Sequence, residues 1–202
     1  MKDEMDILRE VSSIAAGHGS VALSEILGRK IDMEMPSLDI IPSDAVLNKI
    51  STNQIVISVS STILSGLKGN ILFLLEEKSA FKLVDTCYKF RSEDKKGSVF
   101  TEMGLSIIKE IGNVLISSYA GALSMILKTV IIPSIPTLLS GSIQQALNLV
   151  IAPYSREDYV LLAEAVFSEP GEKITGSFYL VLNAEAMKNV QDACKKLLDS
   201  LK

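Results

Sequence analysis

The chain has 202 residues, 48% of them hydrophobic and 22% charged, which suits one domain or two small halves sharing a core and argues against a disordered chain. The net charge is −4 and the 20 Lys and Arg residues are scattered, so no basic face points to nucleic acid or an anionic membrane. One His and two Cys exclude most His-rich metal sites and a disulfide framework, and the acidic start of the chain is unlike a signal peptide. We expect a protein of the reducing cytoplasm.

The first half of the chain predicts one long helix followed by strands. Hydrophobic residues recur with a helical period over residues 3–27, and Gly28 is placed to end that helix. Two β-branched runs and an amphipathic segment predict two strands and a closing helix, at residues 54–59, 70–75 and 79–90. Residues 91–98 are charged, lack apolar side chains and end in Gly-Ser, and we expect a solvated linker there.

The second half repeats this order of elements. Residues 100–127 predict a second long helix. Two further strands and a closing helix are predicted at residues 159–162, 177–182 and 184–200. Residues 129–155 contain no charged side chain and are long enough to cross a bilayer. Because Pro133 and Pro136 would leave backbone groups unpaired in lipid, we expect this stretch to be a buried soluble segment.

The similarity between the halves extends to individual residues. Residues 6–38 align without a gap to residues 106–138, an offset of 100. Further along, an offset of 107 aligns Cys87 with Cys194 and the segments around them. Two offsets that differ by seven fit two copies of one unit, the second with a small insertion. The sequence therefore predicts a tandem duplication.

This duplication sets the expected domain organisation and fold class. We expect one domain over residues 1–202, built from repeats of about 1–92 and 98–202 that the linker joins. The fold class is α/β of the α+β type, with antiparallel strands, two long helices and pseudo-two-fold symmetry. No Gly-rich phosphate loop follows a predicted strand, which argues against a doubly wound Rossmann sheet.

Polar residues on the second long helix form the candidate site. Ser106, Glu110 and Asn113 are spaced i, i+4 and i+7, so they share one helix face and place a carboxylate beside a carboxamide. A solvated helix stripe is the ordinary explanation of such a pattern taken alone. Here Pro136 follows after 22 intervening residues, which lengthens the pattern. The same spacing occurs 100 residues earlier, at Asp6, Glu10, Ser13 and Pro36.

This long pattern resembles the signature of the CheC/CheX/FliY family of chemotaxis phosphatases: Asp or Ser, three residues, Glu, two residues, Asn, about twenty-two residues, then Pro. The segments KEIGN at 109–113, ALS at 122–124 and PSIP at 133–136 are also similar to the family. The resemblance covers almost the whole chain, and the duplication is typical of the CheC type. It implies a CheC-like fold and a hydrolase that removes the aspartyl phosphate of the response regulator CheY.

The resemblance also implies roles for two residues. Asn113 would hold the attacking water in line with the phosphorus, because a carboxamide offers both a donor and an acceptor. Glu110 would pair with the active-site lysine of the regulator. The regulator brings its own Mg2+, so the chain is expected to have no metal ligands or cofactor of its own. Ser106 and Pro136 support the motif, and Pro136 is expected to shape a turn near the site.

The first repeat departs from the motif, because a serine stands where the motif has asparagine. A serine hydroxyl is shorter than a carboxamide, so Glu10 and Ser13, with Asp6 and Pro36, are expected to form a degenerate site. Two other functions stay open: a non-catalytic adaptor that binds a partner such as the deamidase CheD, and a structural module like those of the flagellar switch. The one histidine, His18, is assigned no role. No nucleic acid and no membrane insertion are expected.

Overall fold

The computed structural model describes residues 2–28, 30–49, 54–88, 101–155, 158–169 and 172–200. The predicted linker at 91–98 lies outside these residues, so the division into two repeats about it stays a prediction. The elements in chain order are α1 (Lys2–Leu27), β1 (Asp32–Glu34), β2 (Leu38–Pro42), α2 (Ser43–Lys49), β3 (Ile55–Ser65), β4 (Gly69–Glu76), α3 (Glu77–Tyr88), α4 (Glu102–Leu127), β5 (Ile132–Pro133), β6 (Thr137–Ser142), α5 (Ile143–Ile151), β7 (Tyr159–Glu169), β8 (Glu172–Leu182) and α6 (Ala184–Ser200).

The strands form one curled antiparallel sheet with a symmetric order. Its main path runs β1-β7-β8-β4-β3-β5, while β2 also pairs with β7 and β6 with β3. The first half thus supplies the edge strands beside β7 of the second half, and the second half supplies those beside β3 of the first. This mutual exchange of edge strands means that each half completes the sheet of the other.

The symmetry axis passes through the centre of the sheet. At the offset of 107 residues, Leu72 of β4 corresponds to Tyr179 of β8, and these two residues pair directly with each other. The predicted pseudo-two-fold arrangement of α/β units with an antiparallel sheet is confirmed.

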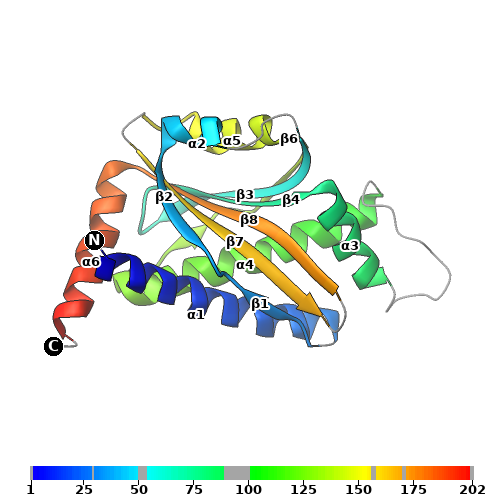
Figure 1. Ribbon diagram of the computed structural model, residues 1–202, viewed down its shortest axis with the longest axis horizontal. Helices are drawn as coiled ribbons and strands as arrows, with labels where there is room; N and C mark the ends of the chain where they lie inside the picture. The colour runs from blue at the N-terminus through cyan, green and yellow to red at the C-terminus, as the bar shows by residue number, and fades with distance from the viewer. Residues whose placement is uncertain are drawn as a thin grey trace.

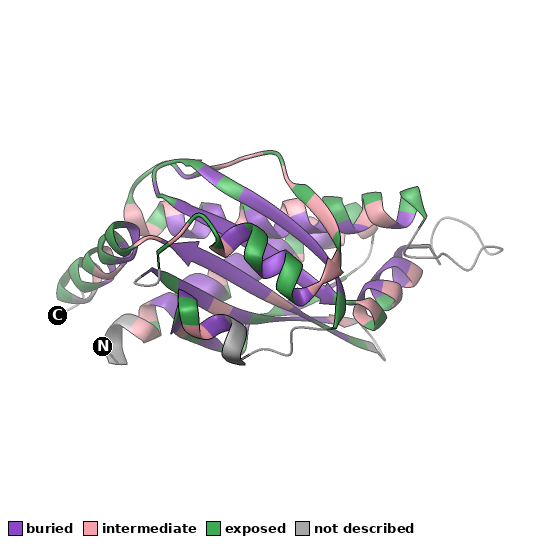
Figure 2. Cartoon of the chain, turned by 90° about the horizontal axis from the view of Figure 1, so that it is seen from above, coloured by how far each residue is buried: buried purple, intermediate pink, exposed green. Residues whose placement is uncertain are grey.

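Helices cover both faces of the sheet (Figure 1). The long helices α1 and α4 run antiparallel along one face, α2 and α5 lie on the other, and α3 and α6 lie at opposite ends. The strands are largely buried between these layers (Figure 2). The larger core lies under α1 and α4, where Val11, Ile111 and Leu115 pack on Val59 and Phe73; the smaller one lies under α2 and α5.

The two long helices end in the same way. Gly28 and Lys128, 100 residues apart, both take left-handed backbone conformations, with φ of 67° and 50°. The chain that follows is held by serines at the same offset: Ser24 Oγ accepts from the Ile31 N–H at 2.9 Å, and Ser124 Oγ from the Ile131 N–H at 3.0 Å. The serines of the repeated Ala-Leu-Ser segments therefore have the same structural role: each fixes the turn between a long helix and the edge strand that follows it.

The uncharged stretch 129–155 differs from its expectation. It forms β5, β6 and α5, and its first part is largely exposed. Val130 is 70% exposed and Ile135 is 87% exposed, although Ile131 is buried in the core. Among the described residues one helix, α4, has the length and hydropathy of a membrane span. Its packing against α1 and the sheet explains its apolar composition, because a long helix that packs against a protein core can have the same length and hydropathy as a membrane span.

Candidate functional site

Helix α4 presents Ser106, Glu110 and Asn113 on the face opposite its core side. Ser106 and Glu110 are exposed and Asn113 is half-buried, while Ile108 and Ile111 of the same helix are buried. Within the described part of the chain, no side-chain hydrogen bond or ion pair engages Glu110 or Asn113. The carboxylate and the carboxamide are thus adjacent on a rigid helix and open to another molecule.

A close contact between α4 and the sheet fixes the position of this pair. Gly112 lies between Glu110 and Asn113, and a Cβ built on it would lie only 2.6 Å from Cβ of Val59 in β3. The helix backbone can approach the strand this closely only because residue 112 has no side chain. Glu110 and Asn113 are therefore held by packing on the sheet as well as by the helix itself.

A small hollow of about 250 Å³ lies beside Glu110. It is bounded by the end of α1, by α3 and by the first turns of α4, and its lining residues are Ile26, Leu27, Cys87, Met103, Ser106, Ile107, Glu110 and Ile111. Most of these side chains are apolar, with Glu110 and Ser106 at the polar side. Sequence reasoning found Ser106 and Glu110 but missed Ile26 and Met103, which come from separate helices and carry no motif.

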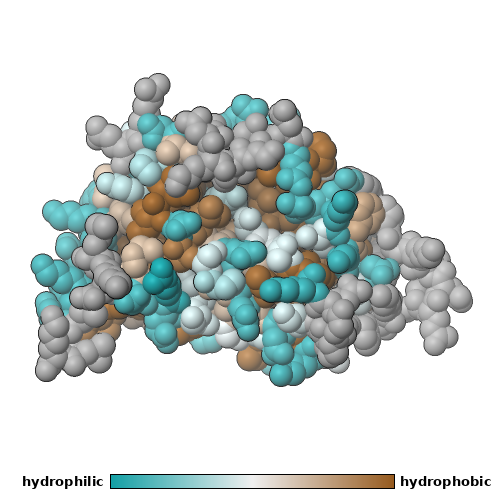
Figure 3. Space-filling model, viewed as in Figure 1, coloured by the Kyte–Doolittle hydropathy of each residue, from teal (hydrophilic) through white to brown (hydrophobic). Residues whose placement is uncertain are grey.

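The twin residues on α1 are exposed but engaged within their own helix. The Asp6 carboxylate pairs with the Arg9 guanidinium at 3.1 Å, and Ser13 Oγ donates to the backbone carbonyl of Arg9 at 3.1 Å. Glu10 is exposed beside them. The outer surface of α1 is mainly hydrophilic in Figure 3. Two of the three twin side chains are therefore already occupied, unlike Glu110 and Asn113.

Pro36 and Pro136 occupy equivalent turns. Pro36 lies between β1 and β2, and Pro136 lies between β5 and β6. Pro136 is not among the residues that line the hollow beside Glu110. The nearby Ser134 anchors its turn to β3, donating its backbone N–H to the Thr62 carbonyl at 2.8 Å.

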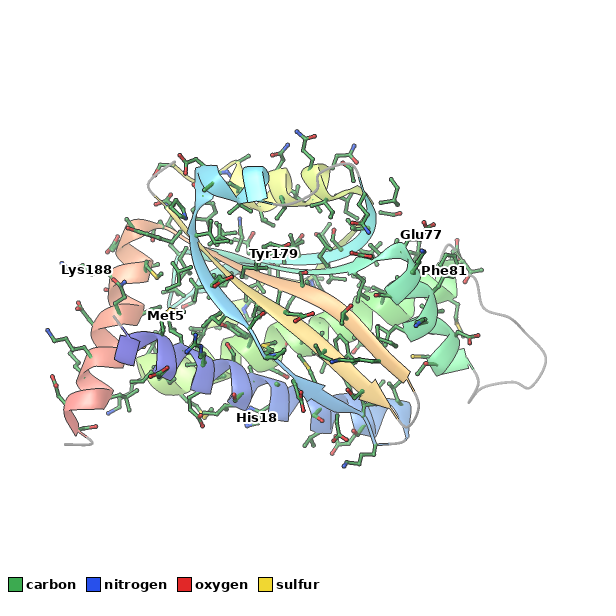
Figure 4. The ribbon with its side chains drawn as sticks, in the orientation of Figure 1. Met5, His18, Glu77, Phe81, Tyr179 and Lys188 are labelled. Atoms are coloured by element: carbon green, nitrogen blue, oxygen red, sulfur yellow. The ribbon has the colours of Figure 1, made fainter. Side chains whose placement is uncertain are left out.

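His18 lies on the outward face of α1, directed away from the sheet (Figure 4), and is exposed. Across the described residues, no group of three or more His, Cys, Asp or Glu side chains gathers in a way that would hold a metal ion. Cys87 and Cys194 are both buried. The expectation that the chain uses no metal or cofactor of its own stays a prediction.

Comparison with known proteins finds similar chemotaxis and flagellar switch proteins. Residues 103–140, which contain Glu110, Asn113 and Pro136, match the CheC-like family. The CheY-P phosphatase CheC of Bacillus subtilis is 31% identical over 136 residues, which span 67% of this chain and 65% of CheC. The flagellar motor switch phosphatase FliY of the same organism is 28% identical over 125 residues, 61% of this chain and 32% of FliY. The chain thus spans less than two thirds of the length of either curated relative.

The fold agrees with these relatives. The crystal structure of Thermotoga maritima FliY superimposes with a TM-score of 0.76 at 25% identity, covering 97% of this chain and 98% of the other. The match therefore includes both long helices and the whole sheet, beyond the segment that carries the motif. The motif helix, the curated relatives and the fold together support membership of the CheC/CheX/FliY family of chemotaxis proteins.

Proposed function

We propose that this protein is a phosphatase that hydrolyses the aspartyl phosphate of phosphorylated CheY, with Glu110 and Asn113 as its catalytic residues. The observation that carries the proposal is the pair itself: a carboxylate and a carboxamide lie three residues apart on α4, open to a partner and engaged by no described neighbour. The relatives named as CheY-P phosphatases support the reaction class.

The chemistry asks little of the phosphatase beyond placement. A water oxygen attacks phosphorus, and the bond between phosphorus and the aspartyl oxygen breaks. The products are inorganic phosphate and the free aspartyl carboxylate. In phosphoryl transfer, positioning and charge stabilisation supply most of the acceleration. The Asn113 carboxamide would orient the water through one accepted and one donated hydrogen bond. The Glu110 carboxylate would pair with the active-site lysine of CheY and so fix the docked position.

The second repeat is proposed to carry most of this activity. Asn113 presents a free carboxamide, whereas Ser13 has a shorter side chain whose hydroxyl donates its hydrogen bond to the Arg9 carbonyl. Water held at Ser13 would lie further from the phosphorus. Since an error of about 1 Å can cost on the order of a hundredfold in rate, the first site is expected to be silent or weak.

The proposal is tested by mixing the protein with phosphorylated CheY and Mg2+ and following the release of inorganic phosphate. The wild type should accelerate the release, and the variant Glu110→Ala/Asn113→Ala should act no faster than CheY alone. Glu110 is exposed and Asn113 half-buried, and neither belongs to the buried core, so circular dichroism should show an unchanged fold. Equal rates for variant and wild type would overturn the catalytic assignment and favour a binding role, for which CheD is the partner to assay.

A further inference from the structure

The hollow beside Glu110 combines features that favour a protein side chain as its occupant. Its walls include Ile26 and Met103, each of which exposes 47% of its surface although both are large apolar residues. Single exposed apolar residues are ordinary, but two that face one hollow from different helices make a local apolar patch.

The size and chemistry of the hollow limit what it can hold. At about 250 Å³ it lies just below the range of roughly 300–1,000 Å³ typical of small-molecule sites. Among the described residues that line it, Glu110 is the one charged side chain and Ser106 the one hydroxyl. It therefore suits a single aliphatic or aromatic side chain better than a whole polar metabolite.

We propose that this hollow receives one apolar side chain of the phosphorylated receiver, and so selects which receiver domains are substrates. The inference rests on the proposed function. Glu110 lines the hollow and is also the carboxylate assigned to the receiver's lysine, so a receiver docked there covers both. Substrates are then the receivers that carry an apolar side chain next to their active-site lysine.

The described residues of the first repeat show a different arrangement. The hollow at the end of α4, beside Ile126 and Leu127, is larger, about 530 Å³, and α6 supplies half of its lining residues. Glu10 is not among its lining residues, and the charged Lys128, Asp192 and Lys196 are. Met103 itself corresponds to Asp3 at the offset of 100. The described residues thus favour docking through an apolar anchor at the second repeat.

The test replaces one wall of the hollow without adding charge. Met103→Gln keeps the length and the helix preference of the side chain but places an amide where the anchor would pack. The matched control is Met125→Gln, on the same helix, where Met125 is 53% exposed and lies outside the hollow. Binding is measured by calorimetry with CheY carrying Mg2+ and beryllofluoride, which stands in for the aspartyl phosphate, and turnover is measured with phosphorylated CheY.

Met103→Gln should raise both Kd and KM about tenfold and leave kcat unchanged, because the anchor contributes equally to ground-state and transition-state binding. Met125→Gln should match the wild type. Ile26→Gln, on the opposite wall, should raise Kd and KM by a similar factor. The double variant Met103→Gln/Ile26→Gln should lose little more affinity than either single variant, because both residues contact the same side chain of the receiver. Wild-type affinity in both wall variants, or equal losses in Met103→Gln and Met125→Gln, would overturn the proposal.

The design separates this inference from the proposed function. A wild-type protein that binds the receiver through Met103 but releases no phosphate would contradict the phosphatase and leave the docking hollow standing. Phosphate release that depends on Asn113 but is indifferent to Met103 and Ile26 would contradict the hollow and leave the phosphatase standing.

Discussion

At the scale of single residues, the two helices differ in what their polar side chains already contact. Ser13 and Asp6 on α1 are both engaged with Arg9, whereas Glu110 and Asn113 on α4 are available to a partner. The difference follows from the sequence only in part. The serine at position 13 was visible in the motif, but its hydrogen bond to the Arg9 carbonyl depends on a rotamer that no sequence pattern specifies.

Placing a serine at position 113 of α4 tests whether the serine at position 13 explains the weak activity expected of the first site. Asn113→Ser should lower kcat by about a hundredfold while leaving KM nearly unchanged, because the carboxamide acts on the water in the transition state. Ser13→Ala is the matched change on α1 and should leave the rate within about twofold of wild type. Steady-state phosphate release from phosphorylated CheY measures both. Full activity in Asn113→Ser, or a larger loss in Ser13→Ala, would refute the assignment of roles.

At the scale of elements, the packing of α4 on β3 fixes the position of Glu110 and Asn113. A methyl group at Gly112 would overlap Val59 in the strand beneath, with all three nearest contacts under 3 Å. Gly112→Ala should therefore push the helix outward, lower the stability by about 1–3 kcal/mol and reduce phosphatase activity. Thermal unfolding and phosphate release measure the two effects.

Gly121→Ala on the same helix is the control for this prediction. A Cβ at Gly121 meets nothing within 4 Å, so alanine there should stabilise the helix by about 0.5–1 kcal/mol and leave activity intact. A Gly112→Ala protein as stable as the Gly121→Ala protein would show that the close approach to Val59 is not needed.

The elements that sequence predicted are those with long periodic runs. The long helices, the closing helices and strands β3, β4, β7 and β8 were predicted and confirmed, and each of these strands extends beyond at least one predicted end. Residues 89 and 90 of the first predicted closing helix lie outside the described residues. The short strands β1, β2, β5 and β6 were missed, because strands of two to six residues are defined by pairing with β7 and β3 of the opposite half. The hollow was missed for a similar reason, since three separated helices form it.

At the scale of the whole molecule, the exchange of edge strands joins both halves into one core. Buried tyrosines within it make stability sensitive to alkali. Burial raises the pKa of Tyr119 on α4, partly offset by a hydrogen bond with Ser12 of α1, and burial also raises the pKa of Tyr179 on β8. Burial, followed by the charge of Asp158, raises the pKa of Tyr154 to about 12. In the unfolded chain all three would ionise near pH 10.

The direction of the pH effect follows from these shifts. Because the folded pKa values lie above the unfolded value, their contribution to stability is complete below pH 10 and declines as the pH rises from 10 toward 12 and beyond. Urea unfolding should give a lower free energy of unfolding at pH 11 than at pH 8. In Tyr119→Phe the difference between the two pH values should be smaller. Tyr159→Phe, at an exposed tyrosine, should decline as the wild type does. An equally steep decline in Tyr119→Phe would contradict the role of its burial.

The most direct measurement of the central claim compares two matched double variants, Glu110→Ala/Asn113→Ala on α4 and Glu10→Ala/Ser13→Ala on α1. Both remove a carboxylate and a polar side chain three residues apart from symmetry-related helices. The rate of phosphate release from phosphorylated CheY with Mg2+ should fall to that of CheY alone for the α4 variant and stay near the wild-type rate for the α1 variant. Equal losses in the two variants, or a loss confined to the α1 variant, would contradict the account.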